Sequence, residues 1–597
     1  MHGGKIDLLW IVGNRQKFNS EGTVPTNKTG RDVIGHYLEE NWKYTETIAL
    51  LAGIAGLFHD FGKANSLFQA KLKRSMSGSA GKNSEPIRHE WLSARLFEAF
   101  IGTDSDADWL ARLGALGPSD SDKLIEAAIK DGLAGGNQRK SFLYMARDKP
   151  IAWAVLWLIL THHRLPYSDD EDYGTTDGLE QWERRMRPDW NSPQYNSGED
   201  KSGLNKLWAF PGGLPVRSAT WCARATAVAK RANRHTNLLA EDWRENTFVL
   251  HMARCALMLA DHYYSGHKST ASWQDKKYKP LANTAKQDGP GRAPHQKLDE
   301  HCIGVSHHAY LIAKTLPALR TTLPAIAEVR ALKKRSPRAY QWQDKAFSMA
   351  LQMRDQSAQN GAFIVNMAST GTGKTLANAR LAYGLANKRL GCRYSILLGL
   401  RTLTLQTGDA LRERTRLDSG ELAVLIGSSA VKALHEQQRA DTRETESALS
   451  GSESSEPYFS EHESIIYDGT LEQSRIGRWL KSQDGRQQSS KLQVLLSAPV
   501  LVSTIDRVIP ATESARGGHQ IAPMLRLLTA DTVFDEPDDF GLEDLPALCR
   551  LVHWCGLLGS RVIFSSATLS PCATGLITAR RLGIDLRSIC SSLFCTN

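Results

Sequence analysis

The hydrophobic pattern divides the chain into two halves of different character. In the first half, apolar runs rich in Ala and Leu are long enough to form buried helices. These predicted helices cover residues 47–58, 92–100, 152–160 and 247–264. From about residue 340, short apolar runs bounded by turn residues alternate with helical segments, which is the pattern of an α/β fold. We therefore predict a multidomain protein, with an all-α domain over residues 1–335 and an α/β domain over residues 336–597.

Polar stretches interrupt both halves. These stretches are rich in Asp, Pro and Gly, in basic residues, or in Ser and Glu. Such compositions predict loops or insertions. They cover residues 75–86, 166–215, 265–300 and 430–490, and the Ser- and Glu-rich part of the last one is 430–465. Strands are predicted at 6–12, 363–367, 395–400, 532–534 and 562–564, and a helix at 376–387. The second half thus reads as a sheet with connecting helices and one flexible insertion.

Composition and charge narrow the class of protein. The 597 residues have a formal net charge of +10, which favours a polyanionic partner such as nucleic acid. None of the nine cysteines forms a C-x-x-C pair, which argues against a disulfide framework or a zinc ribbon and fits a reducing cytoplasm. The longest apolar runs are too short to span a bilayer, and no signal-peptide pattern is present. We expect a cytoplasmic protein without a membrane partner.

A histidine–aspartate pair, His59-Asp60, directly follows the first predicted helix. Such a pair alone is weak evidence, because most are surface or helix-cap residues. Other metal-ligand residues lie on or beside apolar helices, at His89, His162, His163 and Asp261. Polar ligands at the ends of core helices can converge inside a helical bundle. Imidazole with carboxylate suits two divalent transition metal ions (Mn, Fe, Ni or Co), and an Asp that bridges them is what a two-metal phosphodiesterase needs.

A phosphate-binding loop lies in the second half, between a predicted strand and a predicted helix. Its glycines, Gly371 and Gly373 on either side of Thr372, allow backbone N–H groups to wrap the phosphates of ATP. Lys374 would reach the β and γ phosphates, and Thr375 would coordinate Mg²⁺. The helix that begins here adds its dipole to the site.

An acidic box follows the predicted strand at 532–534. Asp535 would bind Mg²⁺, and Glu536 would orient or deprotonate the attacking water. A lone acidic run is usually a solvated loop, but its place between the phosphate loop and a Ser-Ala-Thr motif at 566–568 makes it more specific.

These motifs resemble those of superfamily 2 helicases, and the resemblance implies a RecA-like P-loop lobe. It implies that Ser566 and Thr568 couple the nucleotide state to strand movement, and that Gln343 reads the adenine. It also implies that Arg401 and Thr402 contact the nucleic-acid backbone.

The order of histidines and aspartates in the first half resembles the HD superfamily of metal-dependent phosphohydrolases. The resemblance implies that the residues singled out above are its ligands and that Lys63 contacts phosphate. Two residues compete for the opening histidine. His36 precedes the pair, whereas His301, followed by a Gly-Val step, implies a circularly permuted domain and is slightly favoured. For either residue, the alternative is a solvated histidine on a helix surface.

An HD nuclease ahead of a superfamily 2 helicase is the layout of the CRISPR-associated helicase–nucleases of type I systems. Residues 59–64, 399–409 and 535–540 resemble the type I-F branch. The resemblance implies that a guide-RNA surveillance complex recruits the protein, which nicks the displaced single-stranded DNA and reels it toward the HD site by ATP hydrolysis. Adaptation proteins are a further partner that it suggests.

The sequence departs from this layout in two ways. No room is seen for an adaptation-type domain before Ile6, and no second RecA-like lobe is recognised after the Ser-Ala-Thr motif. We therefore expect a truncated chain whose nuclease activity survives and whose helicase activity is lost.

Two other functions compete with this one. The first is an HD nucleotide phosphohydrolase regulated by its ATP lobe, against which the net charge and the motor motifs argue. The second is a non-catalytic remnant that binds nucleic acid, against which the intact set of metal-ligand residues argues.

Overall fold

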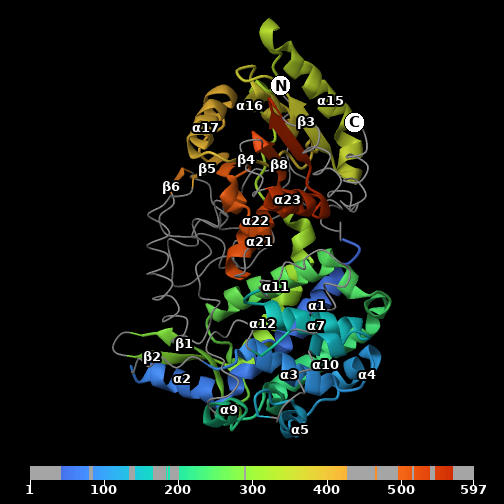
Figure 1. The fold of residues 1–597 in the computed structure, drawn as a ribbon, viewed down its shortest axis with the longest axis vertical. Helices are drawn as coiled ribbons and strands as arrows, with labels where there is room; N and C mark the ends of the chain where they lie inside the picture. Colours follow the sequence, from blue (N-terminus) through green and yellow to red (C-terminus); the bar gives the residue numbers. More distant parts are fainter. Residues whose placement is uncertain are drawn as a thin grey trace, which may run out of the picture.

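The computed structural model describes most of the chain, in two bodies stacked along the long axis of the molecule (Figure 1). The described residues are 42–78, 85–133, 142–165, 183, 186–188, 201–287, 291–426, 464–466, 495–513, 517–537 and 545–568. The predicted strand at 6–12 and His36 lie outside them. We call the mainly helical body the helical domain and the α/β body the sheet lobe.

Helices build most of the helical domain. They are α1 (Thr45–Phe58), α2 (Ser66–Met76), α3 (His89–Ile101), α4 (Asp106–Leu113), α5 (Asp120–Ala127), α6 (Phe142–Met145), α7 (Pro150–Thr161), α9 (Lys201–Leu207), α10 (Ala219–Arg234), α11 (Thr247–Ser265), α12 (Leu298–Thr315) and α13 (Leu319–Thr322). The four helices predicted from apolar runs are confirmed as α1, α3, α7 and α11. Each is almost fully buried, as its composition requires.

A two-stranded hairpin contradicts the prediction that the helical domain is all-α and that residues 265–300 form a loop. Strands β1 (Leu281–Lys286) and β2 (Arg292–Lys297) pair antiparallel. Few of their residues are apolar, so no alternating pattern marks them. Their buried side chains include Asn283 and Gln296, which hydrogen-bond to each other at 3.1 Å. Tertiary contacts and backbone pairing, rather than a hydrophobic stripe, stabilise this hairpin.

A sheet of seven strands forms the centre of the sheet lobe. The strands are β3 (Phe363–Met367), β4 (Tyr394–Leu398), β5 (Leu422–Ile426), β6 (Ser464–Ile466), β7 (Val500–Thr504), β8 (Asp531–Asp535) and β9 (Val562–Ser566). Their order is β3-β9-β8-β4-β7-β5-β6. All neighbours pair in parallel except β5 and β6, which pair antiparallel. The four strands predicted here are confirmed, and β6 lies inside the stretch predicted to be a flexible insertion.

Helices cover both faces of this sheet. They are α14 (Arg330–Lys333), α15 (Gln341–Asn360), α16 (Lys374–Leu385), α17 (Arg401–Thr415), α21 (Pro510–Glu513), α22 (Gly517–Thr529) and α23 (Leu545–Leu557). Side chains alternate between the faces, since Ile396 and Leu398 pack with the core on the α16 side while Leu397 packs with α22 and α23. The near-continuous apolar strands follow from burial on both faces.

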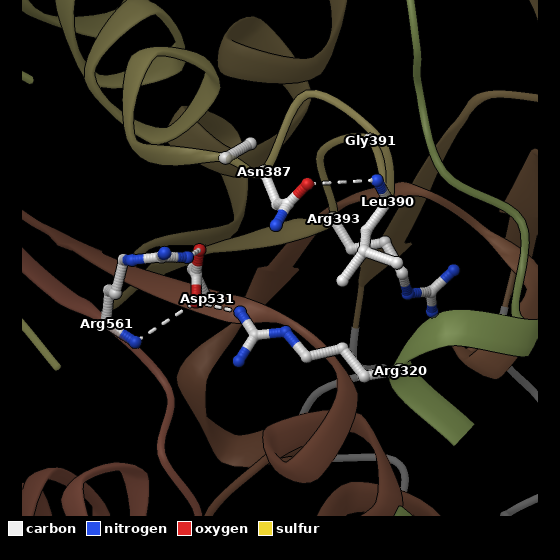
Figure 2. Close-up of a pocket in the computed structure, with 8 residues that line it drawn as sticks. Arg320, Asn387, Leu390, Gly391, Arg393, Asp531 and Arg561 are labelled. Carbon is white, nitrogen blue, oxygen red and sulfur yellow. Dashed lines mark hydrogen bonds and ion pairs between the residues drawn. The ribbon is translucent and has the colours of Figure 1, made fainter. Parts of the chain in front are cut away.

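The sheet lobe and the helical domain share one hydrophobic core. The buried cluster under α22 and α23 is continuous with the core of α1, α7, α11 and α12. A polar connection adds to it at the start of β8, where Arg320 of α13 and Arg561 both pair with Asp531 (Figure 2). The cavity beside this group is about 30 Å³, room for about one water molecule, so it is no nucleotide site.

None of the helices in the described part of the chain combines the length and hydrophobicity needed to cross a membrane.

Candidate metal centre and nucleotide site

The metal-ligand residues predicted in the first half converge at the ends and inner faces of five helices. His59 and Asp60 follow α1, His89 begins α3, His162 and His163 follow α7, Asp261 lies in α11, and His301 lies in α12. All seven side chains are buried. The turn after Asp60 approaches α3 so closely that a Cβ at Gly62 would lie 2.2 Å from the His89 carbonyl oxygen. Glycine at this position is therefore a condition for bringing His89 to Asp60.

Two groups of possible metal ligands share one carboxylate. Asp60, His89, His162 and His163 form one group, and His59, Asp60, Asp261 and His301 form the other. Within each group, one ligand atom from every residue lies within 4.8 Å of the others. Asp60 belongs to both, which is the arrangement of a carboxylate that bridges two ions. We refer to these seven residues, the candidate ligands of two divalent ions, as the metal centre.

His301, rather than a surface histidine, completes the second group. Its Nε2 lies 3.2 Å from an Asp60 oxygen and 3.3 Å from an Asp261 oxygen. The side chain is 1 % exposed, so the alternative of a solvated histidine is wrong for this residue. The competing residue, His36, lies outside the described residues.

Backbone carbonyls fix the orientation of two of the imidazole rings. His59 Nδ1 lies 2.9 Å from the Gly56 carbonyl oxygen, and His162 Nδ1 lies 2.7 Å from that of Ile159. A carbonyl oxygen can only accept, so each Nδ1 is the protonated nitrogen. Nε2 is then the nitrogen of each ring that would bind a metal ion, as in most metal-binding histidines.

Side chains that the sequence reasoning missed orient two further rings. Glu90 places a carboxylate oxygen 3.4 Å from His89 Nδ1 and is held in turn by Arg88. Gln296 places its amide oxygen 3.0 Å from His301 Nδ1. The signal for Glu90 was an acidic residue directly after a candidate ligand, whereas no sequence signal marks Gln296, which lies in the unpredicted hairpin.

The unsatisfied polar atoms of the metal centre fit a divalent metal. The Nε2 atoms of His59, His89, His162 and His301 are buried and have no hydrogen-bond partner among the described residues. Each lies between 3.2 and 3.9 Å from a carboxylate oxygen of Asp60 or Asp261. Buried polar atoms are rarely left unpaired. Imidazole nitrogens and carboxylates are also the donor set that Mn, Fe, Ni or Co accept.

Lys63 is buried next to the metal centre rather than exposed to solvent. Its Nζ lies 2.7 Å from Asp60 Oδ2, and its side chain is 1 % exposed. Burial alone would raise the pKa of Asp60, but the charges of His59 and Lys63 outweigh it and hold that pKa well below its usual range. Burial would likewise lower the pKa of His59, but Asp60 and Asp261 raise it to about 9. These opposite charges are what makes the buried cluster tolerable.

The predicted phosphate loop connects β3 to α16, as its sequence requires. Gly371 and Gly373 have φ of 80° and 85°, conformations that favour glycine. Lys374 Nζ lies 2.5 Å from Glu536 Oε1, so the acidic box and the loop meet directly. Thr372 and Thr375 lie on either side of Gly373 and Lys374, at the start of the helix.

Asp535 ends β8 and is linked to the loop helix through two asparagines that the sequence reasoning missed. Asn378 donates to Asp535 Oδ1 at 3.2 Å and accepts from Asn366 at 2.7 Å. Asn378 lies one helical turn after Lys374, which is the signal that could have found it. Burial raises the pKa of Asp535 to about 6.

The remaining predicted residues lie around the same edge of the sheet. Gln343 donates to the Gly373 carbonyl at 3.1 Å and so contacts the loop itself. Arg401 and Thr402 begin α17 just after β4, and Ser566 ends β9 with Thr568 two residues further on. Because the carboxyl ends of parallel strands share one edge, these groups lie along the same edge of the sheet as the phosphate loop. We call the loop, the acidic box and these residues the nucleotide site, as a candidate.

Relatives with a known description were found in sequence and in structure. The chain is 48% identical over 577 residues to the CRISPR-associated nuclease/helicase Cas3 subtype I-F/YPEST of Pectobacterium atrosepticum. The matched region covers 95% of this chain and 51% of that protein. It is 43% identical over 588 residues to the protein of the same description from Pseudomonas aeruginosa, over 97% of this chain and 52% of that one. No family model matches the sequence.

A solved structure, that of T. fusca Cas3 with ATP, matches 90% of this chain and 50% of its own with 15% identity and a TM-score of 0.32. The chain thus spans about half the length of the curated relatives it matches. Over nearly its whole length, this chain is a homologue of the CRISPR-associated nuclease/helicases of subtype I-F, as its motifs predicted.

Proposed function

We propose that the helical domain is a two-metal nuclease that cuts single-stranded DNA. The observation that carries the proposal is the pair of ligand groups that share Asp60, with four buried imidazole nitrogens left without a hydrogen bond. When bound, two divalent ions supply Lewis-acid chemistry to a scissile phosphate and to an attacking water. The chain's own residues hold the rings in one tautomer, exclude bulk water by burial, and keep Asp60 and Asp261 ionised.

Lys63 has a defined part in this proposal. Its ammonium group donates to Asp60 and so helps to keep that carboxylate ionised, the form that would hold a metal ion. The same ammonium group would contact a phosphate oxygen of the substrate, which is the contact that the sequence resemblance implies.

We further propose that the sheet lobe binds ATP with Mg²⁺ at the phosphate loop. Lys374 would exchange Glu536 for the β and γ phosphates, Thr375 and Asp535 would hold Mg²⁺, and Glu536 would then orient the attacking water. Gln343 would read the adenine, and Arg401 and Thr402 would contact the DNA backbone. Ser566 and Thr568 would couple the nucleotide state to strand movement.

The biological setting is part of the proposal as well. The homologues are named as nuclease/helicases of CRISPR subtype I-F. We propose the same antiviral role here, in the cytoplasm, with single-stranded DNA, a guide-RNA surveillance complex and adaptation proteins as partners. None of the six cysteines in the described ranges forms a disulfide, which agrees with a reducing compartment.

The test is cleavage of circular single-stranded DNA by the purified chain, without ATP, in Mn²⁺, Ni²⁺, Co²⁺ or Fe²⁺. We expect cleavage by the native chain and its loss in Asp60→Ala. The control is Asp122→Ala, which removes a 63% exposed carboxylate of the same domain. Hydrolysis of free nucleotides in place of DNA would favour the nucleotide phosphohydrolase, and no cleavage with any metal would favour a non-catalytic remnant.

A further inference from the structure

Arg254 of α11 lies where the helical domain meets the sheet lobe. The residue is 2 % exposed. Nε donates to the carbonyl oxygen of Thr161 at 2.9 Å, and Nη1 donates to the side-chain oxygen of Gln520 in α22. One buried side chain therefore bonds to the nuclease half and to the ATPase half of the molecule.

The bond to Thr161 acts on the turn that presents two residues of the metal centre. Thr161 is the last residue of α7, and His162 and His163 follow it directly. The last carbonyls of a helix have no partner within the helix. Here the Ile159 carbonyl accepts from His162 Nδ1, and the Thr161 carbonyl accepts from Arg254. A cation at this helix end also interacts favourably with the helix dipole.

The bond to Gln520 acts on a helix that is firmly attached to the sheet. Arg526, six residues further along α22, donates to Ser395 Oγ at 2.8 Å and to the Tyr394 carbonyl at 2.7 Å. After α22, the chain enters β8, which ends at Asp535 of the nucleotide site. A movement of β8 would therefore displace α22 and with it Gln520.

Arg254 depends on these two neutral acceptors because no carboxylate among the described residues offsets its charge. No carboxylate pairs with it in the described part of the chain, and its Nη2 has no hydrogen-bond partner there. Burial lowers the pKa of Arg254 to about 9. A buried charge with few partners is costly, so loss of the Gln520 bond would push the guanidinium group to seek another position.

We propose that Arg254 is a positioning residue through which the docking of α22 sets the metal affinity of the nuclease site. The sheet lobe then controls the nuclease through the turn at His162, without touching the metal centre. This inference rests on the metal centre proposed above.

The test is Mn²⁺ binding to the full chain, measured by titration calorimetry, in Gln520→Ala and Gln520→Glu. We expect Gln520→Ala to weaken Mn²⁺ binding by about 10-fold, the lower end for groups that orient metal ligands. Gln520→Glu keeps an acceptor for Arg254 and should restore the native affinity. Gln352→Ala, at an exposed position of α15 in the same lobe, is the control and should have no effect.

Two results would overturn the inference. Equal Mn²⁺ affinity in Gln520→Ala and the native chain would show that the sheet lobe does not act through Arg254, while the proposed nuclease stands. Weakened binding in Gln520→Ala that Gln520→Glu does not restore would point to a general packing defect. If the native chain itself binds no divalent metal, the proposed function fails first, and the inference fails with it.

Discussion

The two sites of this molecule neutralise their charges in different ways. In the metal centre, seven buried side chains and Lys63 place opposite charges beside one another. Backbone carbonyls also orient the rings of His59 and His162. In the nucleotide site, the main charge contact is the pair between Lys374 and Glu536, whose side chains are 8% and 26% exposed.

The difference reflects where the groups come from. The residues of the metal centre belong to α1, α3, α7, α11 and α12, so the whole helical domain must fold to assemble it. The phosphate loop is local, because one strand, one turn and one helix form most of it. We expect changes in the metal centre to have large and shared effects, and changes in the nucleotide site to be smaller and separable.

The sharpest test of this contrast is removal of the shared carboxylate. Asp60→Asn should lower metal-dependent DNA cleavage by about 10³-fold, since two ions supply several kcal/mol of transition-state stabilisation. Cleavage of circular single-stranded DNA and metal content by mass spectrometry measure it. ATP affinity should stay unchanged, and a parallel loss of ATP binding would contradict the separation of the two sites.

The next largest effect concerns the pH dependence of folding in the sheet lobe. Burial raises the pKa of Asp535 to about 6 in the folded chain, so folding favours its protonated form over its ionised form. Its contribution to stability is full below the unfolded pKa of about 4 and is lost as the pH rises through about 6. Asp535→Asn stays neutral at every pH and keeps an acceptor for Asn378.

At about pH 8, without Mg²⁺, we therefore expect Asp535→Asn to raise the free energy of unfolding by up to roughly 3 kcal/mol, and to have no effect below about pH 4. Urea unfolding at the two pH values measures it. A stabilisation that is the same at both pH values would mean that ionisation of Asp535 is not its cause.

A smaller effect on metal binding is expected from residues that contact the candidate metal ligands. Glu90→Gln removes the charge that faces His89 Nδ1 and should weaken Mn²⁺ binding by about 10- to 100-fold. Titration calorimetry measures it. Glu98→Gln, which changes a carboxylate of the same helix that pairs with Arg95, should leave the affinity as it is. Equal effects of both changes would indicate a loss of α3 packing instead.

The smallest effect is expected at the rim of the nucleotide site. Gln343→Ala removes a hydrogen bond to the phosphate loop, worth about 1 kcal/mol, and should weaken ATP binding by about 5-fold. Fluorescent-nucleotide titration measures it, with DNA cleavage as the control that should not change. A loss of cleavage in Gln343→Ala would show that the two sites are coupled more strongly than their separate assembly suggests.

The sequence determined the local chemistry of this protein. Apolar runs predicted α1, α3, α7 and α11, and the histidines and aspartates at their ends or on them predicted the ligands of the metal centre. Strand–turn–helix patterning placed the phosphate loop at β3 and the acidic box at β8. Such features depend on residues close together in the chain, so a linear pattern reveals them.

Tertiary structure decided the features that join distant residues. It brought His301 of α12 to Asp60 of the α1 end, formed the β1–β2 hairpin that supplies Gln296, and set Arg254 between Thr161 and Gln520. These contacts depend on the three-dimensional packing of helices from separate parts of the chain, and a polar residue that serves them has no periodic pattern. For that reason the sequence named the candidate ligands, and only the fold showed that His301 lies among them and which side chains hold their rings.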